Sequence, residues 1–200
     1  GNRYVNEGDR RDVCANAAVN TGFDSTYAIF TEPVVAGYVR PEEIEAGIAD
    51  GRILKADTLD ELAEKINGFE VKGMFPTVTG DNLKATIEKH NGYIDNGEDL
   101  DFHKVMASTM VKIEEGPYYA LPQFPSVHHT MGGLVIDTMT RVLDIYGQPI
   151  EGLYAAGEVT GGVHGTNRLG SNADADACGF GYISGIVVAT GELPDFIPAE

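Results

Sequence analysis

A glycine-rich stretch near the end of the chain, residues 153–173, constrains the fold more than any other part of the sequence. Its apolar beginning leads directly into Gly157, as a buried strand does when it ends at a tight turn. Further glycines follow: Gly161, Gly162, Gly165 and Gly170. Because glycine has no Cβ, such a loop lets its backbone amides approach a ligand closely. The pattern predicts a strand, a glycine loop and a helix in succession.

Charged residues and a helix cap accompany these glycines. Glu158 is the acid of the stretch and Arg168 is its cation. Ser171 or Asn172 can cap the helix that follows, so that the first amide groups of the helix point toward whatever the loop holds. Glycines alone fit a structural turn equally well. The acid, the cation and the cap together favour a binding site.

Three segments, taken in order, resemble the fumarate reductase/succinate dehydrogenase-type FAD flavoproteins. The glycine stretch is similar to the C-terminal flavin-binding signature of that family. Residues 127–133 contain its His-His pair, and residues 6–12 contain its Asn-Glu-x-x-x-Arg-Asp motif. The resemblance extends from the first residue to about residue 189 and is loose between residues 31 and 118. It is strongest to the soluble members, flavocytochrome c fumarate reductase and urocanate reductase.

The resemblance implies a partial chain of mixed α+β or α/β architecture. Residues 1–126 correspond to the later part of an inserted capping domain, which covers the substrate. Residues 127–200 correspond to the C-terminal segment of a Rossmann-like FAD-binding domain. The N-terminal dinucleotide fingerprint, a GxGxxG on a strand–helix unit, is absent from these 200 residues. We therefore expect FAD as the cofactor of the full-length protein, and weak or no FAD binding by this fragment alone.

Local patterns predict the individual elements. Apolar residues at helical spacing predict helices, and short apolar or β-branched runs between turn residues predict strands. The predicted helices cover residues 11–19, 41–46, 57–66, 81–94 and 172–189. The predicted strands cover residues 2–5, 25–30, 134–137, 142–144 and 153–156, with a hairpin turn over 144–148. Three glycines inside the last helix predict that it packs closely against another surface.

The composition argues against several functions. A formal net charge of −17 disfavours nucleic-acid binding, which needs a positive surface. The sequence contains no apolar run long enough to span a membrane and no Cys/His cluster for zinc, haem or an iron–sulfur centre. Cys14 and Cys178 lie in apolar, helix-like contexts, which favour two buried free thiols over a disulfide. The compartment is not readable from the residues, and the resemblance alone points to the periplasm or cell surface.

Arg11 is the predicted catalytic residue. It occupies the arginine position of the Asn-Glu-x-x-x-Arg-Asp motif, and the resemblance implies that it donates the proton in substrate reduction. Arginine holds its proton strongly, so it can act as an acid only toward a carbanion-like intermediate and with a relay that reprotonates it. The relay residues of the family lie upstream of this sequence. Without the resemblance, an arginine beside Asp12 and near Glu7 indicates a surface ion pair.

The resemblance also implies a group that binds the substrate. His128 and Arg168 correspond to the residues that hold a substrate carboxylate, and Ser171 at the start of the last helix joins them. The planar guanidinium of Arg168 suits bidentate binding of a carboxylate, which a lysine does not reproduce. From the residues alone, the His pair is equally well explained as a strand end whose rings hydrogen-bond to the backbone.

The cofactor-binding residues implied by the resemblance lie in the same region. His129 contacts the flavin, and Glu158 hydrogen-bonds to the FAD ribose. Ala173 and Asp174 contact the flavin through the start of the helix, where the helix dipole stabilises negative charge on a reduced flavin. Asp174 departs from the commonest family pattern, which leaves the substrate open. His164 is expected to belong to the loop scaffold.

Together these residues predict an FAD-dependent reductase of the C=C bond of a small unsaturated carboxylate, such as fumarate or urocanate, of the kind used in anaerobic respiration. Hydride from the reduced flavin goes to one alkene carbon, and the proton of Arg11 goes to its neighbour. The electrons come from a haem or flavin domain or protein outside this chain. One alternative is a dehydrogenase or oxidase of the same superfamily, acting on a ketosteroid or an amino dicarboxylate. Another is a catalytically silent piece that only completes the flavin site of a partner chain.

Overall fold

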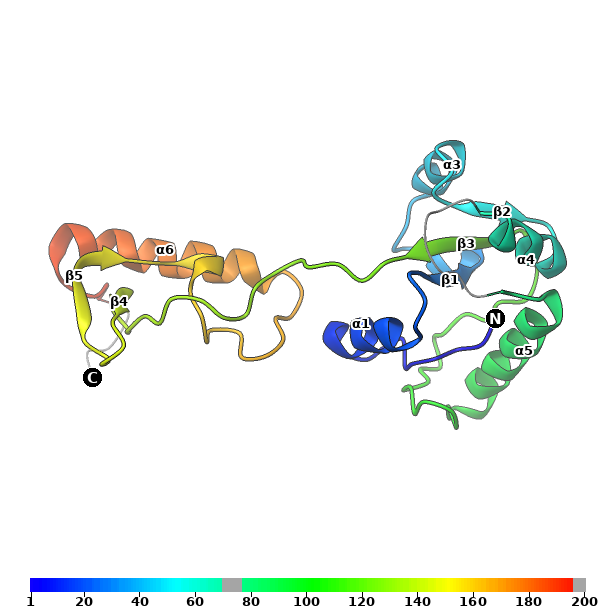
Figure 1. Cartoon of the computed structure of the whole chain (residues 1–200), viewed down its shortest axis with the longest axis horizontal. Helices are drawn as coiled ribbons and strands as arrows, with labels where there is room; N and C mark the ends of the chain where they lie inside the picture. Colours follow the sequence, from blue (N-terminus) through cyan, green and yellow to red (C-terminus); the bar gives the residue numbers. More distant parts are fainter. Residues whose placement is uncertain (70–76, 196–200) are drawn as a thin grey trace. The chain divides into compact units, whose positions relative to one another are not determined.

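The computed structural model of this protein describes residues 1–69 and 77–195, which form two compact units (Figure 1). Unit 1 comprises Gly1–Ser126, and unit 2 comprises Val127–Glu200. Both units combine helices with short strands, so the predicted mixed architecture is confirmed at that level.

The sheet of unit 1 brings together strands that are far apart in the sequence. It consists of β1 (Thr26–Phe30), β3 (Tyr118–Gln123) and β2 (Leu54–Ala56) in that order. The central strand β3 is antiparallel to both neighbours, with Ala120 opposite Ile29 on one side and opposite Leu54 on the other. The predicted strand at 25–30 is therefore confirmed, and it forms an edge of the sheet beside the central strand β3.

The described residues of unit 1 also form the helices α1 (Arg11–Asn20), α2 (Glu32–Val35), α3 (Pro41–Ala49), α4 (Leu59–Asn67) and α5 (Gly80–Asn96). Side chains of α2 and α3 pack on one face of the sheet and those of α4 and α5 on the other, whereas α1 contributes to neither core. Successive side chains of a strand point to opposite faces, so Tyr119 and Ala120 enter different cores. Tyr119 packs with Phe30 and Ile44 beside α2 and α3, whereas Ala120 joins the larger core formed mainly by α4 and α5. Both residues are fully buried.

Local capping explains where the predicted helices of unit 1 begin and end. The hydroxyl of Thr58 accepts a hydrogen bond from the amide of Glu61 at the start of α4, and Thr79 does the same for α5. Gly97 ends α5 in a left-handed conformation with φ of 71°, as the sequence predicts. The predicted strand at residues 2–5 is wrong, because side chains such as Arg3 make the contacts of this segment and its backbone joins no sheet.

Unit 2 contains a hairpin followed by a long helix. β4 (Arg141–Leu143) pairs antiparallel with β5 (Pro149–Tyr154), and the turn between them has Gly147 at φ of 76°. A short 3₁₀ helix, η1 (Gly157–Val159), leads into the glycine loop, and α6 (Asn172–Thr190) follows. The predicted strand at residues 134–137 makes only isolated bridges, from Leu134 to Thr160 and from Ile136 to Val142.

The helix α6 is apolar on all sides and has little cover within unit 2. It packs against η1, where a Cβ at Gly157 would lie 3.4 Å from the Cβ of Ala177. A Cβ at Gly179, Gly181 or Gly185 would meet nothing within 4 Å. The close packing predicted for these glycines is therefore not made by the described residues of unit 2.

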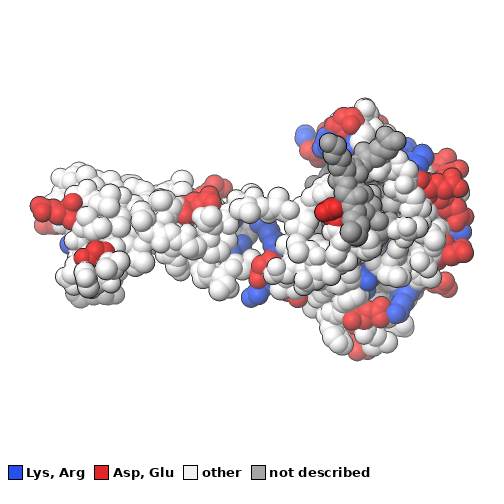
Figure 2. Space-filling view, viewed as in Figure 1, with Lys and Arg blue, Asp and Glu red and all other residues white. Residues whose placement is uncertain are grey.

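The surface agrees with the acidic composition. Acidic side chains gather on the face of unit 1 that Figure 2 shows, and Asp60, Glu61 and Glu64 of α4 are exposed. Among the described residues, no helix is long and apolar enough to cross a membrane, and no group of three or more His, Cys, Asp or Glu could hold a metal ion. Both cysteines are free. Cys14 is half-buried, but Cys178 is exposed, so the prediction of two buried thiols is wrong for Cys178, which lies on an uncovered side of α6.

Candidate functional site

The His pair and the glycine loop are joined by close backbone contact. The amide of Leu134 donates to the carbonyl of Val159 at 2.8 Å, and the amide of Gly161 donates to the carbonyl of Leu134 at 3.0 Å. Gly133 and Gly161 make this approach possible. A Cβ at Gly133 would lie 2.3 Å from the carbonyl oxygen of Val159, and one at Gly161 would lie 2.6 Å from the amide nitrogen of Gly133. The glycines thus hold residues 127–133 against η1.

This contact predicts different effects for two neighbouring glycines. Gly133→Ala is expected to destabilise the protein by about 1–3 kcal/mol, because the new methyl group must displace backbone atoms. Gly132→Ala is the matched control, since its Cβ would meet nothing within 4 Å. Thermal unfolding of the two variants measures the difference. Equal melting temperatures would contradict the close approach.

The contact places two predicted cofactor-binding residues together. The Nδ1 atom of His129 lies 3.5 Å from Oε2 of Glu158. The other oxygen, Oε1 of Glu158, accepts hydrogen bonds from the amide of Thr130 at 2.9 Å and from its hydroxyl at 3.3 Å. The hydrogen bond from the Thr130 amide lowers the pKa of Glu158 most, and a smaller electrostatic effect of His129 acts in the same direction. The Glu158 side chain stays half-exposed while that of His129 is buried, so the carboxylate can still reach a ligand.

A second histidine and an acid on α6 extend this group. The Nε2 atom of His164 lies 3.1 Å from Oδ2 of Asp176, and both side chains are largely buried. The ring of His164 also meets that of His129 edge to face, with 5.5 Å between centroids. The expectation that His164 belongs to the scaffold agrees with this pairing. Asp176 was missed as its partner. The available signal was an acid within a mostly apolar helix.

Among the described residues, no carboxylate forms an ion pair with the buried Arg168, although its charge acts on Glu158 and helps to lower the pKa of that carboxyl. Arg168 is only 7% exposed, its Nη1 donates to the carbonyl of Leu169 at 3.0 Å, and its Nε has no hydrogen-bond partner among the described residues. Residues 127–200 contain one other cationic Lys or Arg, Arg141, and Asp137 pairs with it at 2.6 Å. Burying a cation without an anion is costly, so this arrangement suits an anionic ligand.

The start of α6 differs from the prediction in one respect. Ser171 precedes the helix in a left-handed conformation with φ of 65°, and its side chain makes no capping hydrogen bond. An N-cap serine normally has an extended backbone, which directs its oxygen at the first amides of the helix. Asn172 is already the first helical residue. The predicted cap is therefore wrong for Ser171. Ser171 and Asp174 are exposed, Ala173 is half-buried, and the amide of Asp174 donates to the carbonyl of Ser171 at 3.2 Å.

The two remaining predicted residues have no ion pair among the described residues. His128 is exposed in unit 2. Arg11 is exposed in unit 1, as the first residue of α1. The acids that would compete for Arg11 bind other cations: Asp12 pairs with Arg10 at 3.0 Å, and Glu7 pairs elsewhere. The described residues therefore give no support to the alternative of a surface ion pair for Arg11.

The sequence of the chain matches a known family. The profile of a family described as "FAD binding domain" matches residues 1–173. An NADH:acrylate oxidoreductase of Vibrio harveyi is 46% identical over 187 residues, which cover 92% of this chain and 17% of that protein. A urocanate reductase of Eggerthella lenta is 38% identical over 189 residues, covering 92% of this chain and 29% of the relative.

A solved structure agrees in fold. The open conformation of a flavocytochrome c3 fumarate reductase has a TM-score of 0.63 and 37% identity, covering 92% of this chain and 30% of that one. The chain spans less than a third of the length of each of these three proteins. It belongs to the FAD-binding-domain family of fumarate reductase-type flavoproteins.

Proposed function

We propose that the intact protein is an FAD-dependent reductase of the C=C bond of a small unsaturated carboxylate. The buried, unpaired guanidinium of Arg168 carries this proposal, because it needs an anion that the described residues do not supply. Relatives named for acrylate and urocanate support a substrate of this class. In this proposal, residues 1–126 are the later part of a capping domain, and residues 127–200 are the C-terminal segment of the FAD-binding domain.

The residues of unit 2 fit an FAD group. His129 and the half-exposed carboxylate of Glu158 form one side of its site, and the start of α6 at Ala173 and Asp174 forms the other. A Cβ at Gly162 or Gly165 would meet only open space, which leaves room for a bulky group beside the loop. When bound, FAD supplies the hydride for the reduction. Electrons reach it from a haem or flavin domain or protein outside this chain.

His128, Arg168 and Ser171 bind the substrate in this proposal. A bidentate contact from Arg168 orients one carboxylate, and donors from His128 and Ser171 complete its binding. Fixed donors at the carboxylate also stabilise the negative charge that develops as hydride reaches the alkene. Arg11 transfers a proton from its guanidinium to the neighbouring carbon, so that the alkene gains one hydride and one proton.

The proposal is tested on the intact flavoprotein under anaerobic conditions. The flavin is first reduced with dithionite, and acrylate, fumarate and urocanate are then added one at a time. One of these acids is expected to reoxidise the flavin rapidly, while its saturated counterpart leaves the flavin reduced. If none of a broad panel of unsaturated acids reoxidises it, the proposed function is wrong.

A further inference from the structure

Arg11 begins α1, a helix with few buried contacts to the rest of unit 1. Ala18 is the only buried residue of α1, and the side chain of Arg10 provides no cap at the N-terminus of this helix. A cavity of about 750 Å³ borders both this region, at Tyr4 and Cys14, and strand β1. The position of Arg11 therefore depends on the segment that leads into the helix, residues 3–9.

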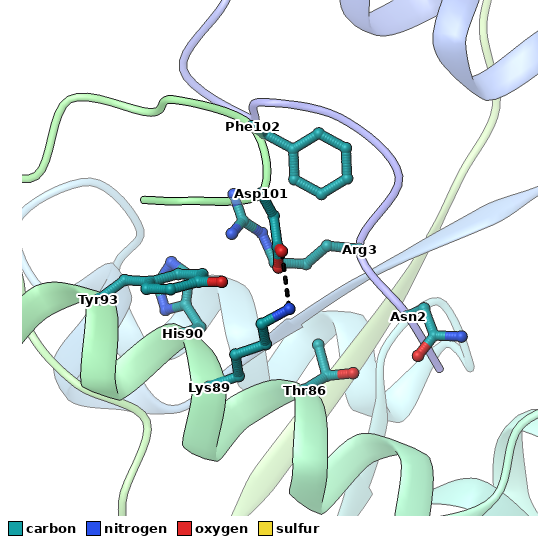
Figure 3. Close-up of a pocket in the computed structure, with 8 residues that line it drawn as sticks. All are labelled: Asn2, Arg3, Thr86, Lys89, His90, Tyr93, Asp101 and Phe102. Atoms are coloured by element: carbon teal, nitrogen blue, oxygen red, sulfur yellow. Dashed lines mark hydrogen bonds and ion pairs between the residues drawn. The ribbon is translucent and has the colours of Figure 1, made fainter. Parts of the chain in front are cut away.

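An arginine in that segment bridges two carboxylates. Nε and Nη2 of Arg3 donate to the two oxygens of Glu7 at 2.6 and 2.9 Å, and Nη2 also donates to Oδ2 of Asp99 at 2.7 Å. Lys104 adds a second cation, 3.2 Å from Glu7. The ring of Phe102 lies over the Arg3 guanidinium, 5.0 Å from its carbon, at a cavity of about 350 Å³ (Figure 3). The fork of Arg3 thus ties residues 3–7 to the loop after α5.

Asp99 anchors the other end of this tie. Its side chain is fully buried, and Oδ1 accepts hydrogen bonds from the amides of Asp101 and Phe102 at 3.0 and 3.3 Å. Oδ2 accepts from the amide of Lys104 at 3.3 Å in addition to Arg3. Burial alone would raise the pKa of Asp99, but the hydrogen bonds from Arg3 and the backbone hold it well below its usual range. The anchor is therefore a permanent negative charge.

The same network prevents Glu7 from pairing with Arg11 in place of the substrate. Glu7 lies close to Arg11 in the sequence, but Arg3 and Lys104 occupy its carboxylate. We propose that Asp99 is a positioning residue for Arg11: through Arg3 and Glu7 it fixes residues 3–9 and keeps the Arg11 guanidinium free for the substrate. This inference rests on the proposed function.

Asp99→Asn in the intact flavoprotein tests the link. The amide can keep its oxygen toward the amides of Asp101 and Phe102, but it presents N–H groups to Arg3 and to the Lys104 amide, so the bridge and the hydrogen bond from Lys104 are both lost. Asp101→Asn is the matched control. It removes the same charge two residues away, where the carboxylate is partly exposed and pairs with Lys89 at 2.7 Å.

Three measurements separate positioning from general damage. In Asp99→Asn, the rate of flavin reoxidation at saturating substrate is expected to fall about 100-fold, as for a small displacement of a catalytic group. KM, FAD content and reduction by dithionite are expected to stay unchanged, and the solvent deuterium isotope effect is expected to increase because proton transfer limits the rate. Hydrogen exchange is expected to accelerate at the amides of α1 and to stay unchanged in α5.

A second variant, which cuts the same bridge at its other end, keeps the test decisive if Asp99→Asn fails to fold. Arg3→Lys keeps the charge but cannot bridge Glu7 and Asp99 with a planar fork, so it is expected to reproduce the slow reoxidation. If the wild type reacts but both variants match it, or if α1 and α5 loosen equally, the positioning role is wrong while the proposed function stands. If no unsaturated acid reoxidises the wild-type flavin, the proposed function fails, and this inference fails with it.

Discussion

Replacing Arg11 with alanine in the intact flavoprotein is expected to slow substrate-dependent flavin reoxidation by about 10²–10⁴-fold, the usual contribution of a general acid. The guanidinium is exposed, has no ion pair among the described residues and begins α1, so its loss removes no contact that holds the fold. FAD content, the melting temperature and flavin reduction by dithionite are therefore expected to match the wild type. Stopped-flow absorbance of the flavin, with each unsaturated acid as oxidant, measures the effect.

The preceding residue offers the control for this variant. Arg10→Ala removes the same type of side chain from an exposed pair with Asp12, which contributes little stability. It is expected to leave reoxidation within about twofold of the wild type. If Arg11→Ala reoxidises as fast as Arg10→Ala, Arg11 is not the acid, and a dehydrogenase of the same superfamily becomes the better explanation.

Replacing Arg168 is expected to weaken substrate binding strongly without destabilising the substrate-free protein. Losing one partner of a buried, charge-assisted pair costs about 2–5 kcal/mol, so KM is expected to rise by roughly 30-fold or more in Arg168→Met. Arg168→Lys is expected to restore little of the substrate binding, because an ammonium group does not reproduce the two parallel hydrogen bonds of a guanidinium. Without substrate, Arg168→Met also removes a buried cation that has only the Leu169 carbonyl as partner. The melting temperature of this variant is therefore expected to stay the same or rise.

Arg141→Met provides the contrast within the same unit. Arg141 pairs with Asp137 at 2.6 Å, so its loss is expected to lower the melting temperature slightly and to leave KM unchanged. Steady-state kinetics and thermal unfolding of the three variants decide the matter. A clear loss of stability in Arg168→Met with unchanged KM would make Arg168 a structural residue and would remove the main support for the proposed carboxylate site.

Much of the local structure could be predicted because its causes are local. Apolar spacing and a threonine cap define α4 and α5, and Gly97 ends α5 because glycine tolerates a positive φ. The hairpin turn before β5 follows in the same way from Asp144 and Gly147. Residues 2–5 could not be predicted in this way, because Arg3 also pairs with an acid 96 residues away.

For the candidate site, too, some features could be predicted from the sequence and others could not. The residues 153–173, with the His pair and the arginine motif, were enough by themselves to indicate the family, since glycine, acid and arginine positions are properties of the sequence. Only the tertiary structure decided that Arg168 is buried with no ion pair among the described residues, that Asp176 binds His164, and that Ser171 does not cap α6. Burial and pairing depend on segments that approach each other in space, and no local pattern encodes which acid reaches which base.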